Sequence, residues 1–285
     1  MTKMRYLAEN DLNTFIKDFY KHIGDNAPPI ARLYALGAEV LIHLIGERWV
    51  QDNVFGKAPL DNFLRFNSDI REDGFKHADR VVSIAEMLFH FQGIEGIKQR
   101  IADIGSSSVE DTVGELEGAK LLYRSNIPFR FVIPTGRRGE DFDVKAFATD
   151  GTGINCEMKT KPAETVLSPE TVWNTLNNNR NQLPKGYAGI MFMKIPEAWI
   201  SQSEITQIIS SALNRFFRGT DRVASVVLHW EEWLFTSNGP AMRIVKFRRE
   251  LNPNSSFRSL VASEILDKFS RMAANNNWRY FAKLF

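Results

Sequence analysis

The run from residue 136 to 161, GRRGEDFDVKAFATDGTGINCEMKTK, gathers acidic residues and a lysine over a short length of chain. Asp141 and Asp143 stand one residue apart, and a Glu-Met-Lys triplet follows at residues 157–159. Alternate residues of a β-strand point to the same face, so each of these pairs would share a face. Carboxylates held close together need a cation or a proton. Their oxygens suit a hard divalent cation such as Mg2+, which makes this stretch the candidate site.

A β-hairpin would bring these residues together. The Asp150-Gly151 dipeptide separates two extended runs, residues 141–148 and 154–160, and is typical of a tight hairpin turn. The apolar residues would then share one face of the hairpin, and the polar residues the other: Asp141, Asp143, Lys145, Asn155, Glu157 and Lys159. A half-buried hairpin alternates in this way for structural reasons alone, and Glu-x-Lys is a common solvent-facing pair. The two acids on the neighbouring strand favour a site.

The periodicity of the whole chain predicts two domains. Residues 1–104 carry apolar residues at helical spacing and no strand signal, which predicts an all-helical domain with no readable chemistry. Residues 105–285 begin with a serine run that offers helix N-caps. The elements expected there are a helix at 109–124, strands at 129–134, 141–148 and 154–160, a helix from 169 to about 183, a strand at 187–195, a helix at 205–217, two more strands and a closing helix. This order predicts an α/β fold with a mixed sheet flanked by helices.

Composition limits the classes of protein that are compatible with the chain. With 285 residues, 44% of them hydrophobic and 25% charged, it reads as a globular protein. It has no apolar run long enough to cross a membrane and no signal peptide, so we expect a cytoplasmic protein without a membrane partner. Its one cysteine, Cys156, excludes an internal disulfide, and Cys and His residues lack zinc spacing. A net charge of +2 does not by itself indicate a nucleic-acid binder.

From residue 109 to 194 the order of elements and motifs resembles the PD-(D/E)XK nuclease superfamily, whose fold is called restriction-endonuclease-like. The helical glutamate of the family pattern corresponds to Glu115, with Glu117 as a second candidate. Glu140-Asp141 stands where the family has Pro-Asp, and the family triplet corresponds to Glu157-Met158-Lys159. The register leaves both Asp141 and Asp143 eligible as the metal-binding aspartate.

The resemblance implies a metal-dependent nuclease. Its metal, Mg2+ or Mn2+, would be held by the carboxylate of Asp141 or Asp143, by Glu157 and by the backbone carbonyl of Met158. Lys159 would orient or deprotonate the attacking water, or stabilise charge on the phosphate. Glu115 would bind a second metal or order a water.

Residues around this centre are candidates for nucleic-acid binding. Arg137 and Arg138 lie in a glycine-flanked turn and could grip a backbone phosphate. Lys161 follows Lys159 by two residues, on the same face if the strand continues. The resemblance places Arg180 and Gln182, at the end of the next helix, where related nucleases carry supporting polar residues.

The expected function is hydrolysis of nucleic acid, with DNA favoured by family analogy, in restriction, repair or defence. A homodimer would suit two cuts on opposite strands. The alternative is an inactive member of the fold that binds nucleic acid or protein. The full set of Glu115, Asp141 or Asp143, Glu157 and Lys159 favours the enzyme.

Overall fold

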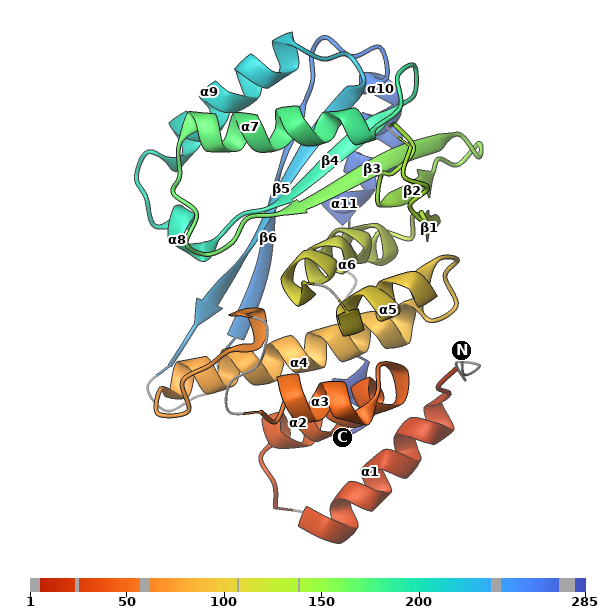
Figure 1. The fold of residues 1–285 in the computed structure, drawn as a ribbon, viewed down its shortest axis with the longest axis vertical. Helices are drawn as coiled ribbons and strands as arrows, with labels where there is room; N and C mark the ends of the chain where they lie inside the picture. The colour runs from red at the N-terminus through yellow and green to blue at the C-terminus, as the bar shows by residue number, and fades with distance from the viewer. Residues whose placement is uncertain are drawn as a thin grey trace. The chain divides into compact units, whose positions relative to one another are not determined.

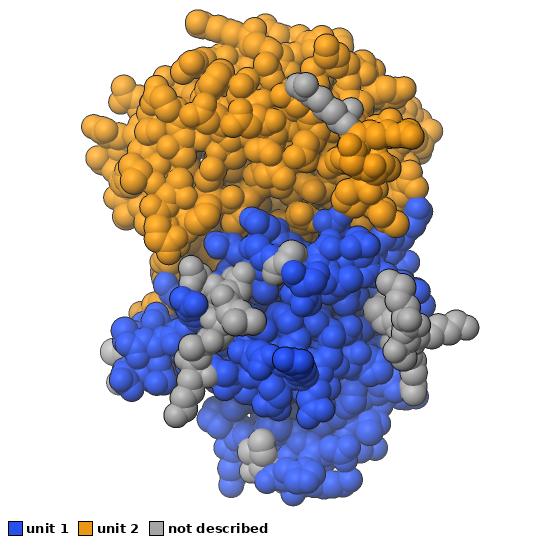
Figure 2. Space-filling view, in the orientation of Figure 1, with its two compact units in different colours: residues 1–113, 276–285 blue, residues 114–275 orange. Residues whose placement is uncertain are grey.

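The computed structural model describes residues 6–23, 26–56, 62–106, 108–137, 139–236, 242–271 and 280–285. The chain forms two compact units (Figure 2). Residues 1–113 and 276–285 make up unit 1, and residues 114–275 make up unit 2. The boundary expected at residue 105 lies just ahead of helix α6 (Val109–Arg124), whereas the compact units divide within that helix.

Unit 1 is helical, as the periodicity of its sequence predicts. Its helices are α1 (Glu9–Ile23), α2 (Pro29–Leu44), α3 (Glu47–Asn53), α4 (Arg71–Phe91) and α5 (Ile97–Ser106), with short 3-10 turns at Asn62–Leu64 and Phe281–Lys283 (Figure 1). Local sequence signals explain the helix starts: Pro29 occupies the first helical position of α2, and acidic residues occupy the first turns of α1 and α4. No described helix of the chain is long and apolar enough to cross a membrane.

Unit 2 is built on a mixed six-stranded sheet. The strands are β1 (Phe129–Phe131), β2 (Val144–Phe147), β3 (Gly153–Thr160), β4 (Gly189–Lys194), β5 (Val223–Leu234) and β6 (Met242–Leu251). They lie in sequence order: β3, β4 and β5 are parallel, and the pairs β1–β2, β2–β3 and β5–β6 are antiparallel. This confirms the predicted α/β class and the predicted order of elements.

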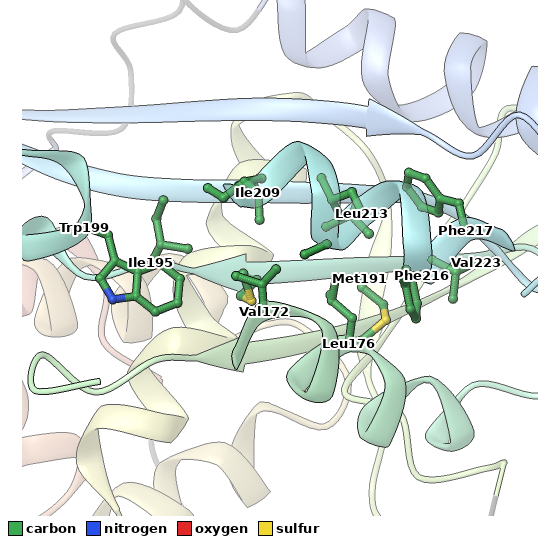
Figure 3. Close-up of a cluster of buried hydrophobic side chains, with 14 of the residues drawn as sticks. Val172, Leu176, Met191, Ile195, Trp199, Ile209, Leu213, Phe216, Phe217 and Val223 are labelled. Carbon is green, nitrogen blue, oxygen red and sulfur yellow. The ribbon is translucent and has the colours of Figure 1, made fainter. Parts of the chain in front are cut away.

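Two helices cover one face of the sheet, α7 (Pro169–Asn179) and α9 (Ile205–Arg218) (Figure 1). The N-cap of α7 is Ser168, whose side chain accepts a hydrogen bond from the Thr171 N–H at 3.0 Å. The apolar stripes of both helices bury a large core against β4 and β5, shown in Figure 3 with residues such as Leu176, Met191 and Leu213. A four-residue helix, α8 (Glu197–Ile200), adds the buried Trp199 and is too short for a periodic signal.

Helix α6 covers the opposite face of the sheet and approaches β3 very closely. A Cβ atom added to Gly114 would lie 1.7 Å from Thr160 Oγ1, and one added to Gly118 would lie 2.6 Å from Met158 Sδ. Only glycine allows this approach. The same face packs against the last helical segment, formed by α10 (Arg258–Val261), a π-helical turn (Ala262–Leu266) and α11 (Asp267–Arg271). Unit 2 is therefore a three-layer α/β/α structure.

Candidate active site

The predicted hairpin is formed by β2 and β3. Val144 pairs with Cys156, and Lys145 pairs with Asn155, so apolar and polar residues are matched as the alternation predicts. The turn places Gly151 at φ +84°, where glycine is favoured. Thr149, at the start of the turn, is hydrogen-bonded to the π-helical turn at Ala262–Leu266. Glu264 accepts hydrogen bonds from the N–H and the hydroxyl of Thr149 at 2.9 and 2.7 Å.

Asp143 lies where pairing between β2 and β3 begins. Its backbone N–H donates to the Cys156 carbonyl at 3.1 Å, and its carboxylate Oδ2 accepts from the Met158 N–H at 2.7 Å. Asp143 immediately precedes the first residue of β2, and its carboxylate therefore extends the hydrogen bonding along β3 past that end of β2. A strand residue directs its N–H and C=O toward the same neighbour, so the Met158 carbonyl also points to this side. Both Asp143 and Glu157 are buried, with 7% and 0% of their surfaces exposed.

Asp141 has a different role from Asp143. Its carboxylate Oδ1 accepts hydrogen bonds from the N–H groups of Thr135 and Gly136, at 2.7 and 3.1 Å, and so closes the loop before the hairpin. The spacing of the sequence leaves both aspartates eligible. The structure places the side chain of Asp143, and not that of Asp141, beside the triplet.

The ammonium of Lys159 is held by the carboxylate of Glu157, with Nζ 2.8 Å from Oε1. Burial, and then the charge of Asp143, raise the pKa of Glu157 more than Lys159 lowers it. Burial alone would lower the pKa of Lys159, but the carboxylates of Asp143, Glu157 and Glu115 outweigh burial and raise it. The site thus brings three carboxyl groups, those of Asp143, Glu157 and Glu115, within electrostatic range of one lysine.

Glu115 belongs to this site, whereas Glu117 does not. Glu115 is half-buried on α6, and its charge raises the pKa values of both Glu157 and Lys159, which places it within electrostatic range of both. Glu117 instead forms ion pairs with Lys194 at 2.6 Å and with Arg243 at 2.9 Å. Of the two candidates for the helical glutamate, Glu115 is therefore the one within electrostatic range of the triplet.

The partners of Glu117 form a separate buried ion network under α6. Lys194 on β4 also lies 3.5 Å from Glu231 on β5, which pairs with Arg243 on β6. Burial raises the pKa of Glu117 and lowers that of the neighbouring His229 to about 3, so His229 is neutral. The network ties the helix that carries Glu115 to three strands. Its members are far apart in sequence, and no local pattern signals their meeting.

Gln182 and Arg180 are close in sequence, but only Gln182 contacts the candidate site. With its amide oriented to donate, Gln182 Nε2 lies 2.8 and 3.1 Å from the two carboxylate oxygens of Glu157 and 3.1 Å from the Asp141 carbonyl. Gln182 therefore contacts the candidate metal-binding carboxylate itself. The guanidinium of Arg180 donates to the Gly219 carbonyl after α9, which is a structural contact.

Two other candidate nucleic-acid contacts are described: Arg137 lies in the loop before β2, and Lys161 directly follows β3. Arg137 is exposed in the loop that Asp141 closes, and Arg138 lies outside the described residues. The backbone N–H of Lys161 donates to the Lys194 carbonyl at 3.0 Å, so the chain continues beside β4, and burial lowers the pKa of Lys161.

The donor set at the hairpin fits a hard divalent cation. Asp143, Glu157 and the Met158 carbonyl offer only oxygen atoms, and Mg2+ is typically held by one or two carboxylates with several waters. Within the described ranges no three Asp, Glu, His or Cys side chains converge as a metal-binding group. A cation here would therefore be bound by two carboxylates, and its charge would offset the burial and the repulsion from Asp143 that raise the pKa of Glu157.

Comparison of the chain with protein-family models, with curated proteins and with solved structures gives no match.

Proposed function

We propose that the protein is a divalent-cation-dependent nuclease of the PD-(D/E)XK type, with a restriction-endonuclease-like fold in unit 2 and DNA as its substrate. One observation carries the proposal: the buried carboxylates of Asp143 and Glu157 meet where β2 and β3 begin to pair, with Lys159 Nζ 2.8 Å from Glu157. Burying two carboxylates side by side is unfavourable, and such arrangements are concentrated at functional sites.

Asp143, Glu157 and the Met158 carbonyl would hold the cation, Mg2+ or Mn2+. When bound, such an ion polarises the scissile phosphate and lowers the pKa of a coordinated water. Gln182 would fix the orientation of the Glu157 carboxylate through its two amide contacts. Gln182 is therefore proposed as a positioning residue, which acts through Glu157.

Lys159 would act as a cation in this reaction. Its raised pKa favours the ammonium form, which can donate hydrogen bonds to the phosphate and stabilise the charge that develops there. Glu115, from the side of α6, would order the attacking water. The water oxygen would bond to phosphorus as the bond to the 3′-oxygen breaks, leaving a 5′-phosphate and a 3′-hydroxyl.

The proposal is tested with purified protein, supercoiled plasmid and end-labelled single- and double-stranded DNA, in Mg2+, Mn2+ or EDTA. Glu157→Ala and Lys159→Ala remove the proposed cation ligand and the proposed charge stabiliser. Glu140→Gln, an exposed carboxylate in the preceding loop, is the matched control. We expect metal-dependent cleavage by the wild type and the control, and a loss of about 100-fold or more in the other two variants.

If the wild type binds DNA but leaves DNA, RNA and branched substrates intact with both metals, the proposal is wrong. The inactive binding module then replaces it. In that case Glu157→Ala would leave the affinity for nucleic acid unchanged or improve it, because it removes a negative charge from the site.

A further inference from the structure

Unit 1 contains a cavity of about 690 Å3 between α1 and α2. Its volume lies within the range of small-molecule sites, roughly 300 to 1,000 Å3. The wall combines residues that are distant in sequence, from Phe15 and Phe19 on α1 and Tyr34 on α2 to Phe55 after α3 and Phe285. Folding of the unit thus builds one aromatic concavity from four segments of chain.

The aromatic rings are held in place and still leave apolar surface uncovered. Tyr34 donates its partly buried hydroxyl to the Val54 carbonyl at 3.0 Å, and its ring packs edge-on against Phe55, with 6.1 Å between the ring centroids. Phe55 and Phe285 nevertheless remain 47% and 38% exposed. Apolar surface gathered at a cavity is typical of binding sites.

The charged groups that line the cavity indicate which kind of ligand would suit it. The guanidinium of Arg32 is engaged by the Ala27 carbonyl at 2.8 Å and the Tyr20 hydroxyl at 3.0 Å. Asp18 pairs with Lys21 at 2.9 Å. Glu39 is exposed on α2 and, among the described residues, makes no ion pair or hydrogen bond. His22 also lines the cavity, with Nδ1 2.7 Å from the Asp18 carbonyl oxygen. The lining therefore offers the negative charge of Glu39 to a ligand, while the guanidinium of Arg32 is already engaged.

We propose that this cavity binds a small apolar molecule that carries a positive charge, such as an aromatic or aliphatic amine. The apolar body would lie against the rings of Phe15, Phe19 and Phe55, and the ammonium would face Glu39. Aromatic faces attract cations, and burial of the body removes apolar surface from water. The site is independent of the proposed nuclease centre in unit 2.

Three naphthalene probes of the same size test the charge preference on the full chain: 1-naphthylmethylamine, 1-naphthalenemethanol and 1-naphthoate. Binding is followed by calorimetry at neutral pH, where the amine is a cation. We expect the amine to bind about tenfold tighter than the carboxylate, with the alcohol between them. Saturable binding in this order supports the site.

Two variants locate the binding. Glu39→Gln should lower the affinity of the amine toward that of the alcohol and leave the alcohol unchanged. Ala35→Phe, which fills the cavity from α2, should weaken all three probes while the far-ultraviolet circular dichroism stays that of the wild type. The inference is overturned if no probe binds saturably, if the carboxylate binds as tightly as the amine, or if neither variant changes any affinity. Glu157→Ala should bind the probes like the wild type, whether or not it cleaves DNA.

Discussion

Glu115 and Glu117 stand two residues apart on α6, yet their carboxylates belong to different clusters. Glu115 acts electrostatically on Glu157 and Lys159, whereas Glu117 is enclosed by Lys194 and Arg243 at 2.6 and 2.9 Å. Residues two apart on a helix point in widely different directions, so one helix can serve both clusters. The ion network around Glu117 fixes the helix that presents Glu115.

Substitution of the two glutamates should therefore have opposite consequences. Glu117→Gln leaves buried cations with one carboxylate fewer and should lower the free energy of unfolding by about 1–4 kcal/mol. Glu115→Gln should change stability little and lower the rate of DNA cleavage. Urea unfolding and cleavage assays measure the two effects. A large stability loss in Glu115→Gln with none in Glu117→Gln would contradict this division.

Substitutions of Asp141 and of Asp143 should also have different effects on cleavage. Asp143→Asn keeps an oxygen that can accept from the Met158 N–H but removes the charge, so it should abolish metal-dependent cleavage without lowering the melting temperature. Asp141→Asn weakens the loop contacts to Thr135 and Gly136 and should retain most of the cleavage activity. Thermal unfolding and plasmid cleavage, run on both proteins, decide the matter. Full activity in Asp143→Asn would rule out its carboxylate as a ligand.

Stability should fall with rising pH because of Glu157. Its pKa is raised above the ordinary value of 4.5, so above pH 4.5 the folded chain retains a proton that the unfolded chain releases. The free energy of unfolding then decreases as pH rises toward the raised pKa, by at most about 1.4 kcal/mol per pH unit for this group. Glu157→Gln lacks the effect.

Urea unfolding of the metal-free wild type and of Glu157→Gln, measured from pH 5 to pH 9, checks this prediction. The difference between the two proteins removes the contribution of groups that titrate in both. Parallel pH profiles would show that Glu157 keeps an ordinary pKa. Added Mn2+ should flatten the wild-type profile only, because it stabilises the ionised carboxylate.

Replacing glycine with alanine usually stabilises a helix. Because α6 approaches β3 closely, we expect this replacement in α6 to destabilise the protein instead. Gly118→Ala places a methyl group 2.6 Å from Met158 Sδ and should lower stability by about 1–3 kcal/mol. Gly74→Ala in α4 is the matched control, because nothing lies within 4 Å of the added carbon there. The control should be stabilised by up to about 1 kcal/mol. Equal melting-temperature shifts in both variants would contradict the close packing.

Local signals explain which parts of the fold could be predicted. The Asp150-Gly151 turn and the Ser168-Pro169 start of α7 act over a few residues and appear where the sequence indicates. Apolar and polar residues of β2 and β3 are paired as their alternation predicts, but β2 begins at Val144 instead of residue 141, and the polar side chains of Asn155 and Glu157 are buried. The ion network could not be predicted, because Glu117, Lys194 and Arg243 meet only after the sheet has assembled. The choice between Asp141 and Asp143 depends on the path of the loop from residue 132, which strand periodicity does not specify.

The division of the chain into units has a consequence for synthesis on the ribosome. Unit 1 is discontinuous: residues 276–285 belong to it, and within them Phe281 is fully buried and its N–H donates to Glu86 at 3.1 Å. The sheet is contained in residues 114–275, so all of it has been translated before this last piece emerges. The N-terminal helices therefore cannot complete their core until Phe281 has been translated, which is after every strand of the sheet.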